Sequence, residues 1–69
     1  MIKIKKKDQV NDIIKYDVYR YDKLNKDFEI EKDVNQSYYS LWYKGTCQGS
    51  FKTLTDCAEA IIRKLVRKD

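Results

Sequence analysis

The sequence predicts an α+β domain, a three- or four-stranded antiparallel sheet with one C-terminal amphipathic helix packed on one face. Three observations predict it. Apolar and polar residues alternate with a period of two from Ile14 onward. A Lys44-Gly45 turn signal separates two aromatic-rich runs. The segment after Thr53 has the apolar stripe of a helix. Sixty-nine residues suit one core, so we expect a single β-β-β-β-α domain over 13–69.

The first half of the chain predicts two strands after a basic start. Residues 1–12 are polar and lysine-rich, and we expect a flexible arm or an edge strand there. One face of the next strand carries Ile14, Tyr16 and Val18; the other carries Lys15, Asp17, Tyr19 and Tyr21. Residues 22–27 predict a turn. A second strand then alternates Phe28 and Ile30 with Glu29 and Glu31, which makes its outer face acidic.

Residues 38–52 predict a β-hairpin. A two-residue loop at Lys44-Gly45 pairs Trp42 with Cys47 and Leu41 with Gln48. In this register Trp42 and Phe51 face the helix, and the opposite face carries Tyr39, Leu41 and Tyr43. A three-residue loop would shift the pairing by one residue and bury Tyr39, Leu41 and Tyr43 instead.

The C-terminal segment predicts one helix. Thr53 is the expected N-cap, with the carboxylate of Asp56 three residues later. The apolar stripe consists of Leu54, Cys57, Ala58, Ile61, Ile62 and Leu65. One helix covers one face of a sheet, so the other face is expected to meet solvent.

Composition excludes several classes of protein. No apolar run approaches the ~20 residues that cross a bilayer, and no apolar segment follows the basic N-terminus as in a signal peptide. We therefore expect a cytoplasmic protein without membrane contact. With two cysteines and no histidine we expect no metal site, and we expect both thiols to be reduced.

Catalytic machinery is not recognisable in the sequence. There is no histidine to act as a general base, and the only glycines, Gly45 and Gly49, belong to the hairpin rather than to a phosphate-binding loop. Cys47 and Cys57 lack a base partner and fit apolar positions. We expect a non-enzymatic binding module that needs no cofactor.

The open face of the sheet is the expected binding surface, because it gathers aromatic side chains. This predicted surface consists of Tyr19, Tyr21, Tyr39, Leu41 and Tyr43, ringed by Lys15, Lys44 and Lys52. We expect it to contact protein, either a second copy of the chain or another partner. Besides contact with protein and contact with nucleic acid, a third interpretation is that Tyr39, Leu41 and Tyr43 belong to the hydrophobic core.

Nucleic acid is the alternative partner, since the net charge is +4 and basic residues gather at both ends of the chain. Sheet tyrosines would stack on bases, and phosphates would meet Lys3, Lys5, Lys6, Lys7 and Arg20. Arg63, Lys64, Arg67 and Lys68 form the second basic end. The position of Glu29 and Glu31 distinguishes the protein from the nucleic-acid hypothesis. In a central strand these carboxylates would repel phosphates, whereas in an edge strand they would only discourage unwanted strand pairing.

The end of the chain resembles a known family. Tyr43-Lys44-Gly45, Gly49-Ser50-Phe51-Lys52-Thr53, Ala58 and Ile62 look like the ending of the N-terminal arm-site-binding domains of tyrosine recombinases. The resemblance covers residues 38–62, and it implies a sheet followed by a helix, with DNA bound through the sheet. A small lysine-rich chain of this kind would suit an accessory protein of a phage or mobile element.

Overall fold

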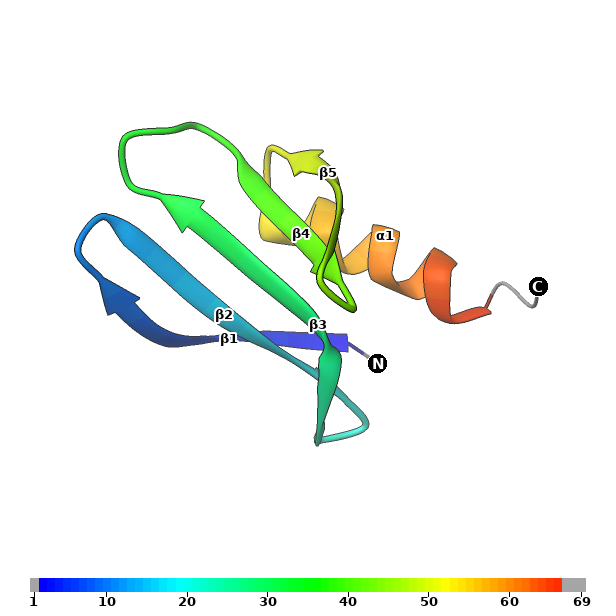
Figure 1. The fold of residues 1–69 in the computed structure, drawn as a ribbon. Coiled ribbons are helices and arrows are strands. Elements are labelled where there is room, and N and C mark those ends of the chain that lie inside the picture. The colour runs from blue at the N-terminus through cyan, green and yellow to red at the C-terminus, as the bar shows by residue number, and fades with distance from the viewer. Residues whose placement is uncertain (1, 67–69) are drawn as a thin grey trace.

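The chain folds into a five-stranded sheet followed by one helix (Figure 1), in a computed structural model that describes residues 2–66. The elements are β1 (Ile2–Val10), β2 (Ile13–Arg20), β3 (Lys23–Asp33), β4 (Tyr39–Tyr43), β5 (Thr46–Phe51) and α1 (Leu54–Val66). The strands lie in the order β1-β2-β3-β4-β5, and every neighbouring pair is antiparallel. The predicted α+β class is confirmed, with five strands rather than three or four. Arg67, Lys68 and the predicted domain end at 69 lie outside the described residues.

The additional strand is the lysine-rich N-terminal segment. Of the two expectations for this segment, an arm or an edge strand, the structure has the edge strand β1, paired with β2 from Ile2 opposite Arg20 to Val10 opposite Ile13. The turn after it is made possible by Asn11, whose φ of 55° lies in the left-handed region that asparagine tolerates. Side chains alternate along β1, so Ile4 packs against the core while the lysines remain exposed.

A tight turn at Tyr21 and Asp22 connects β2 to β3. Both residues have positive φ, 53° and 64°, which is the conformation that suits a two-residue hairpin turn. The predicted turn over 22–27 is therefore too long, because β3 already begins at Lys23. The polar residues of this region instead form an irregularity within β3, where Asn25 Oδ1 accepts a hydrogen bond from the Asp27 N–H at 3.0 Å.

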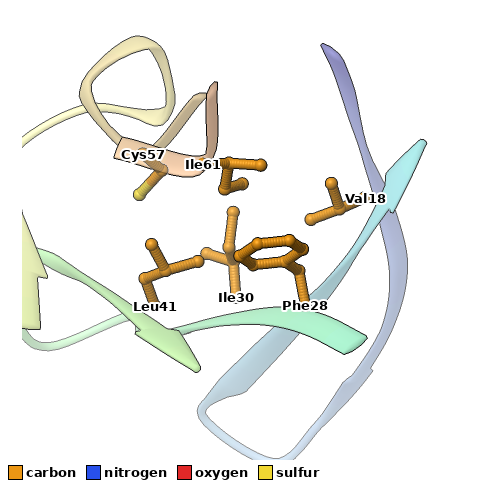
Figure 2. Close-up of a cluster of buried hydrophobic side chains, with 6 residues drawn as sticks. All are labelled: Val18, Phe28, Ile30, Leu41, Cys57 and Ile61. Carbon is orange, nitrogen blue, oxygen red and sulfur yellow. The ribbon is translucent and has the colours of Figure 1, made fainter. Parts of the chain in front are cut away.

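The core lies between the sheet and α1 (Figure 2). Its buried side chains come from three strands and the helix: Val18, Phe28, Ile30, Leu41, Cys57 and Ile61, each at most 2% exposed. The helix packs against β1, β4 and β5. Of the predicted apolar stripe, Cys57 and Ile61 are buried, whereas Ile62 is 45% exposed. The helix begins as predicted, because Thr53 Oγ1 accepts a hydrogen bond from the Asp56 N–H at 3.0 Å.

The predicted faces of the terminal hairpin are wrong for β4, whereas Phe51 of β5 does face the helix as predicted. Leu41 lies opposite Ile30 and Tyr43 opposite Phe28, so these β4 side chains join the buried face of β3. Trp42, predicted to lie under the helix, is opposite Glu29 on the open face. The cause is the pairing of β4 with β3, which sequence reasoning on the hairpin alone did not consider: an apolar β3 face requires an apolar partner, and Leu41 and Tyr43 supply it.

A β-bulge in β5 reconciles this arrangement with the predicted turn. Lys44 and Gly45 do form a two-residue loop, with φ values of 50° and 81°, and Trp42 does pair with Cys47. Leu41, however, pairs with Gly49 rather than Gln48, because one extra residue is accommodated in β5. The shift places Phe51 opposite Tyr39 and turns both toward the helix.

Deleting Gln48 should therefore be tolerated. A one-residue deletion in a strand ordinarily turns the following side chains to the opposite face. Here the deletion removes only the extra residue, so Gly49 remains opposite Leu41 and Phe51 remains opposite Tyr39. We expect the free energy of unfolding, measured by urea denaturation, to fall by less than about 1 kcal/mol. A fall of about 3 kcal/mol, the scale of losing a buried phenylalanine, would show that Phe51 had turned away from the helix.

Candidate binding site

The predicted aromatic surface is not assembled. Leu41 is 2% exposed, and Tyr39 and Tyr43 are half-buried against the core on the side of the sheet that α1 covers. Tyr39 makes an edge-on contact with Tyr16, with ring centroids 5.9 Å apart, and Tyr43 lies 4.8 Å from Phe28. The third interpretation of the sequence, in which Tyr39, Leu41 and Tyr43 are core, is the one that holds.

The other predicted surface residues are dispersed. Tyr19 and Lys15 do lie on the open face, where Lys5 Nζ is 5.3 Å from the centroid of the Tyr19 ring. Tyr21 is 69% exposed in the β2–β3 turn, 5.3 Å from the guanidinium of Arg20. Lys44 lies in the β4–β5 turn, and Lys52 lies between β5 and α1. These side chains form no common surface.

The open face carries carboxylates at its centre. β3 is the middle strand of the sheet, so Glu29 and Glu31 lie centrally, and Asp17 of β2 is directly opposite Glu29. Phosphates would be repelled there. The predicted lysines for nucleic acid, Lys3, Lys5, Lys6 and Lys7, lie on the outer strand β1, and Lys3 forms an ion pair with Asp22 at 3.3 Å. Of the predicted stacking tyrosines the open face keeps Tyr19, and its centre carries carboxylates where the nucleic-acid hypothesis needs positive charge.

A groove between the terminal hairpin and the second half of α1 combines an apolar floor with a basic rim. We call it the hairpin–helix groove. Its floor is apolar and consists of Phe28, Leu41, Phe51 and Ala60. Its volume is about 290 Å³, which is at the small end of ligand sites and suits one large side chain. Ala60 is the small residue that α1 contributes to this floor, and its short side chain leaves space above Phe51.

The rim of the hairpin–helix groove is polar and basic. Gln48 borders it from the bulge, and Arg63 and Lys64 border it from α1. Lys64 Nζ lies 4.9 Å from the centroid of the Tyr43 ring, and Lys44 Nζ approaches the same ring to 5.4 Å. Among residues 2–66, no carboxylate lies within 4.0 Å of these three cations; the ion pair within this range joins Lys3 to Asp22.

Sequence reasoning missed the groove because it treated Arg63 and Lys64 as part of a basic end of the chain, without a neighbouring apolar site. The available signal was their spacing from Ala60. Residues three and four apart share one side of a helix, so a small residue followed by two cations marks an apolar notch with a basic border. Which strand faces that notch depends on the tertiary arrangement.

The buried Cys57 thiol is a poor candidate nucleophile. Burial raises the pKa of the Cys57 thiol to about 11, and the nearby Asp56 carboxylate adds to the rise, so the thiol is protonated and poorly nucleophilic near neutral pH. Within residues 2–66, Asp, Glu and Cys side chains do not gather in groups of three that could hold a metal ion. The described helix is too short and too polar to span a membrane.

The Cys57 thiol predicts a loss of stability in alkaline solution. The unfolded chain releases this proton near pH 9.0, whereas the folded chain keeps it until about pH 11. The stabilisation is therefore complete below pH 9.0 and declines as the pH rises toward 11. Tyr16, whose pKa is also raised by burial, acts in the same direction. We expect urea denaturation to show lower stability at about pH 10 than at about pH 8, and a smaller difference in Cys57→Ala. An equal difference in both proteins would contradict this assignment.

Comparisons of the chain with protein-family models, curated proteins and solved structures find no match. The hairpin–helix groove, whose basic rim has no carboxylate partner among residues 2–66, is therefore the feature on which a function is best based.

Proposed function

We propose that the chain is a non-enzymatic binding module whose hairpin–helix groove binds an acidic segment of a partner protein. The observation that carries this proposal is the apolar floor bordered by Arg63 and Lys64, neither of which has an ion-pair partner among residues 2–66. An apolar side chain of the partner would fill the groove, and neighbouring carboxylates would meet the two cations. The apolar contact supplies affinity, and the charges select the partner.

Protein is a better fit than nucleic acid for two reasons. The groove floor is made of aliphatic and partly buried aromatic side chains rather than exposed flat rings on which bases stack. In addition, the carboxylates Asp17, Glu29 and Glu31 occupy the middle of the open face. They would repel the phosphates of a nucleic acid that continued from the groove onto that face. A phosphate-bearing ligand remains a defined outcome of the test.

The test uses a capped heptapeptide, Thr-Glu-Thr-Leu-Thr-Glu-Thr, and its lysine analogue, in which both glutamates are replaced. We expect calorimetric titration at low salt to show binding of the glutamate peptide and none of the lysine peptide. In the double variant Arg63→Glu with Lys64→Glu, affinity for the glutamate peptide should fall by at least about tenfold, since two attractive charge contacts become repulsive.

The matched control is Lys6→Glu with Lys7→Glu, which lowers the net charge equally but lies on β1, at the opposite edge of the sheet. Its affinity should stay within about twofold of that of the unmodified chain. If both double variants lost the same affinity for the glutamate peptide, the loss would be explained by net charge alone, and the proposal would be overturned. Retardation of a short DNA duplex that exceeds peptide binding, and that weakens steeply with salt, would favour nucleic acid instead.

A further inference from the structure

The two edges of the sheet are protected very differently. An edge strand presents a row of backbone N–H and C=O groups that can pair with another chain, and proteins commonly block such edges with lysines and bulges. β1 follows this rule, because Lys3, Lys5, Lys6 and Lys7 occupy its length and its pairing is irregular beside Lys6. β5 also has a bulge, at Gln48, but it carries no charged residue from Thr46 to Phe51 and so lacks the charges that protect β1.

The outer edge of β5 is accessible. β5 pairs only with β4 among the described strands, so its other edge has no strand beside it (Figure 1). Thr46, Cys47, Gln48 and Ser50 are all exposed. The hairpin–helix groove adjoins this edge, since Gln48 and Phe51 belong both to the groove lining and to β5.

We propose that the partner segment binds in an extended conformation along the outer edge of β5 and becomes a sixth strand of the sheet. This inference rests on the proposed function and specifies how the acidic segment is held. Backbone hydrogen bonds to β5 supply affinity that is independent of sequence, and the groove selects the side chains, as in other cases of strand addition.

Strand geometry specifies the sequence of the partner. Side chains two residues apart lie on the same face of a strand, about 7 Å from one another. On the face that α1 covers, one apolar side chain would enter the groove beside Phe51 and Ala60, and the carboxylate two residues away would reach Arg63 or Lys64. The residue between them points to the open side of the sheet. The expected motif is therefore apolar-x-acidic, or its reverse.

A second copy of the chain is a poorer occupant than an acidic segment. Lys44 precedes β5 and Lys52 follows it, and both are exposed. Antiparallel pairing of two β5 strands about a two-fold axis would place Lys44 of each copy near Lys52 of the other, and would bring both basic groove rims to the same interface. Like charges at such positions oppose pairing. Charge complementarity thus selects an acidic partner.

Two peptides with the same amino-acid composition but different spacing of the glutamates test the proposed strand addition. Thr-Glu-Thr-Leu-Thr-Glu-Thr places both glutamates on the same face as leucine, whereas its isomer Thr-Thr-Glu-Leu-Glu-Thr-Thr places them on the opposite face. We expect the isomer to bind about tenfold more weakly, since its carboxylates point away from Arg63 and Lys64. Both peptides read the same in either direction, so the result does not depend on strand orientation.

The backbone hydrogen bonds between β5 and the peptide provide a second test of strand addition. Hydrogen exchange measured by NMR should slow by at least about tenfold at some amides of β5 when the first peptide binds, and remain unchanged at those of β1. Methylating the peptide nitrogen of leucine or that of the next threonine should weaken binding in one case only, because alternate amides face opposite edges.

The outcomes separate the two proposals. Binding that depends on Arg63 and Lys64 but is equal for both isomers, or that leaves β5 exchange unchanged, would overturn strand addition and leave the acidic-segment module standing. No binding of either peptide would overturn both. A stable dimer in sedimentation, with β5 amides already protected in the free protein, would overturn strand addition by a partner and identify the second copy as the occupant.

Discussion

Replacing Leu41 with alanine is expected to lower the free energy of unfolding by about 3 kcal/mol. Leu41 is 2% exposed, lies opposite Ile30 at the centre of the sheet and points toward Cys57 and Ile61 of the helix (Figure 2). Truncation removes buried apolar surface and leaves a cavity that the surrounding side chains fill only partly. A chain of this length has a total stability of about 3–10 kcal/mol, so the variant should be close to unfolded.

The control for Leu41→Ala is the same substitution at Leu24, in the irregular part of β3. Leu24 is 44% exposed, so its truncation should lower stability by about 1 kcal/mol or less. Urea denaturation followed by far-ultraviolet circular dichroism measures both. If Leu41→Ala were no more destabilising than Leu24→Ala, Leu41 would have to lie on the open face, and the aromatic surface predicted there would be restored.

Elements whose determinants are local could be predicted from the sequence. The helix start depends on Thr53 and the residues that follow it, and the Lys44-Gly45 turn depends on a glycine that adopts a φ of 81°. The alternation of Tyr16 and Val18 with charged residues likewise fixes the buried face of β2 without reference to any other strand. In each case the controlling interactions lie within a few residues of one another.

The missed features depend on contacts between distant segments or on unusual backbone conformations. Tyr21 and Asp22 form a tight turn although neither is glycine, so composition gave no sign of it. The buried face of β4 is decided by its pairing with Phe28 and Ile30, and the bulge at Gln48 then adjusts β5 to match. In β4 both faces carry large apolar side chains, so the sequence of this strand alone does not show which face is buried. The pairing with β3 decides it.

The same distant contacts create the hairpin–helix groove. Arg63 and Lys64 are ordinary surface cations when the helix is considered alone. They become the border of an apolar site only because α1 returns across β4 and places Ala60 beside Phe51. A binding site built from the docking of one helix should therefore be lost whenever that docking is weakened, even by a residue outside the groove.

Ile61 provides this test, with its neighbour Ile62 as the control. Ile61 is 0% exposed between the helix and the sheet, whereas Ile62 is 45% exposed on the same helix. We expect Ile61→Ala to lower the free energy of unfolding by about 3 kcal/mol and Ile62→Ala by about 1 kcal/mol. Neither residue lines the hairpin–helix groove. Peptide affinity of the folded molecules should nevertheless fall more in Ile61→Ala, since a loosened helix no longer holds Arg63 and Lys64 against the hairpin.

Temperature separates helix docking from simple loss of folded protein. At low temperature, where circular dichroism shows Ile61→Ala to be folded, a remaining deficit in peptide affinity reports the position of α1 rather than the folded fraction. Equal stability of the Ile61→Ala and Ile62→Ala variants would contradict the packing of α1 on the sheet. Equal affinity at full folding would instead mean that the groove does not depend on how tightly the middle of the helix is packed, which would place its binding determinants on the hairpin alone.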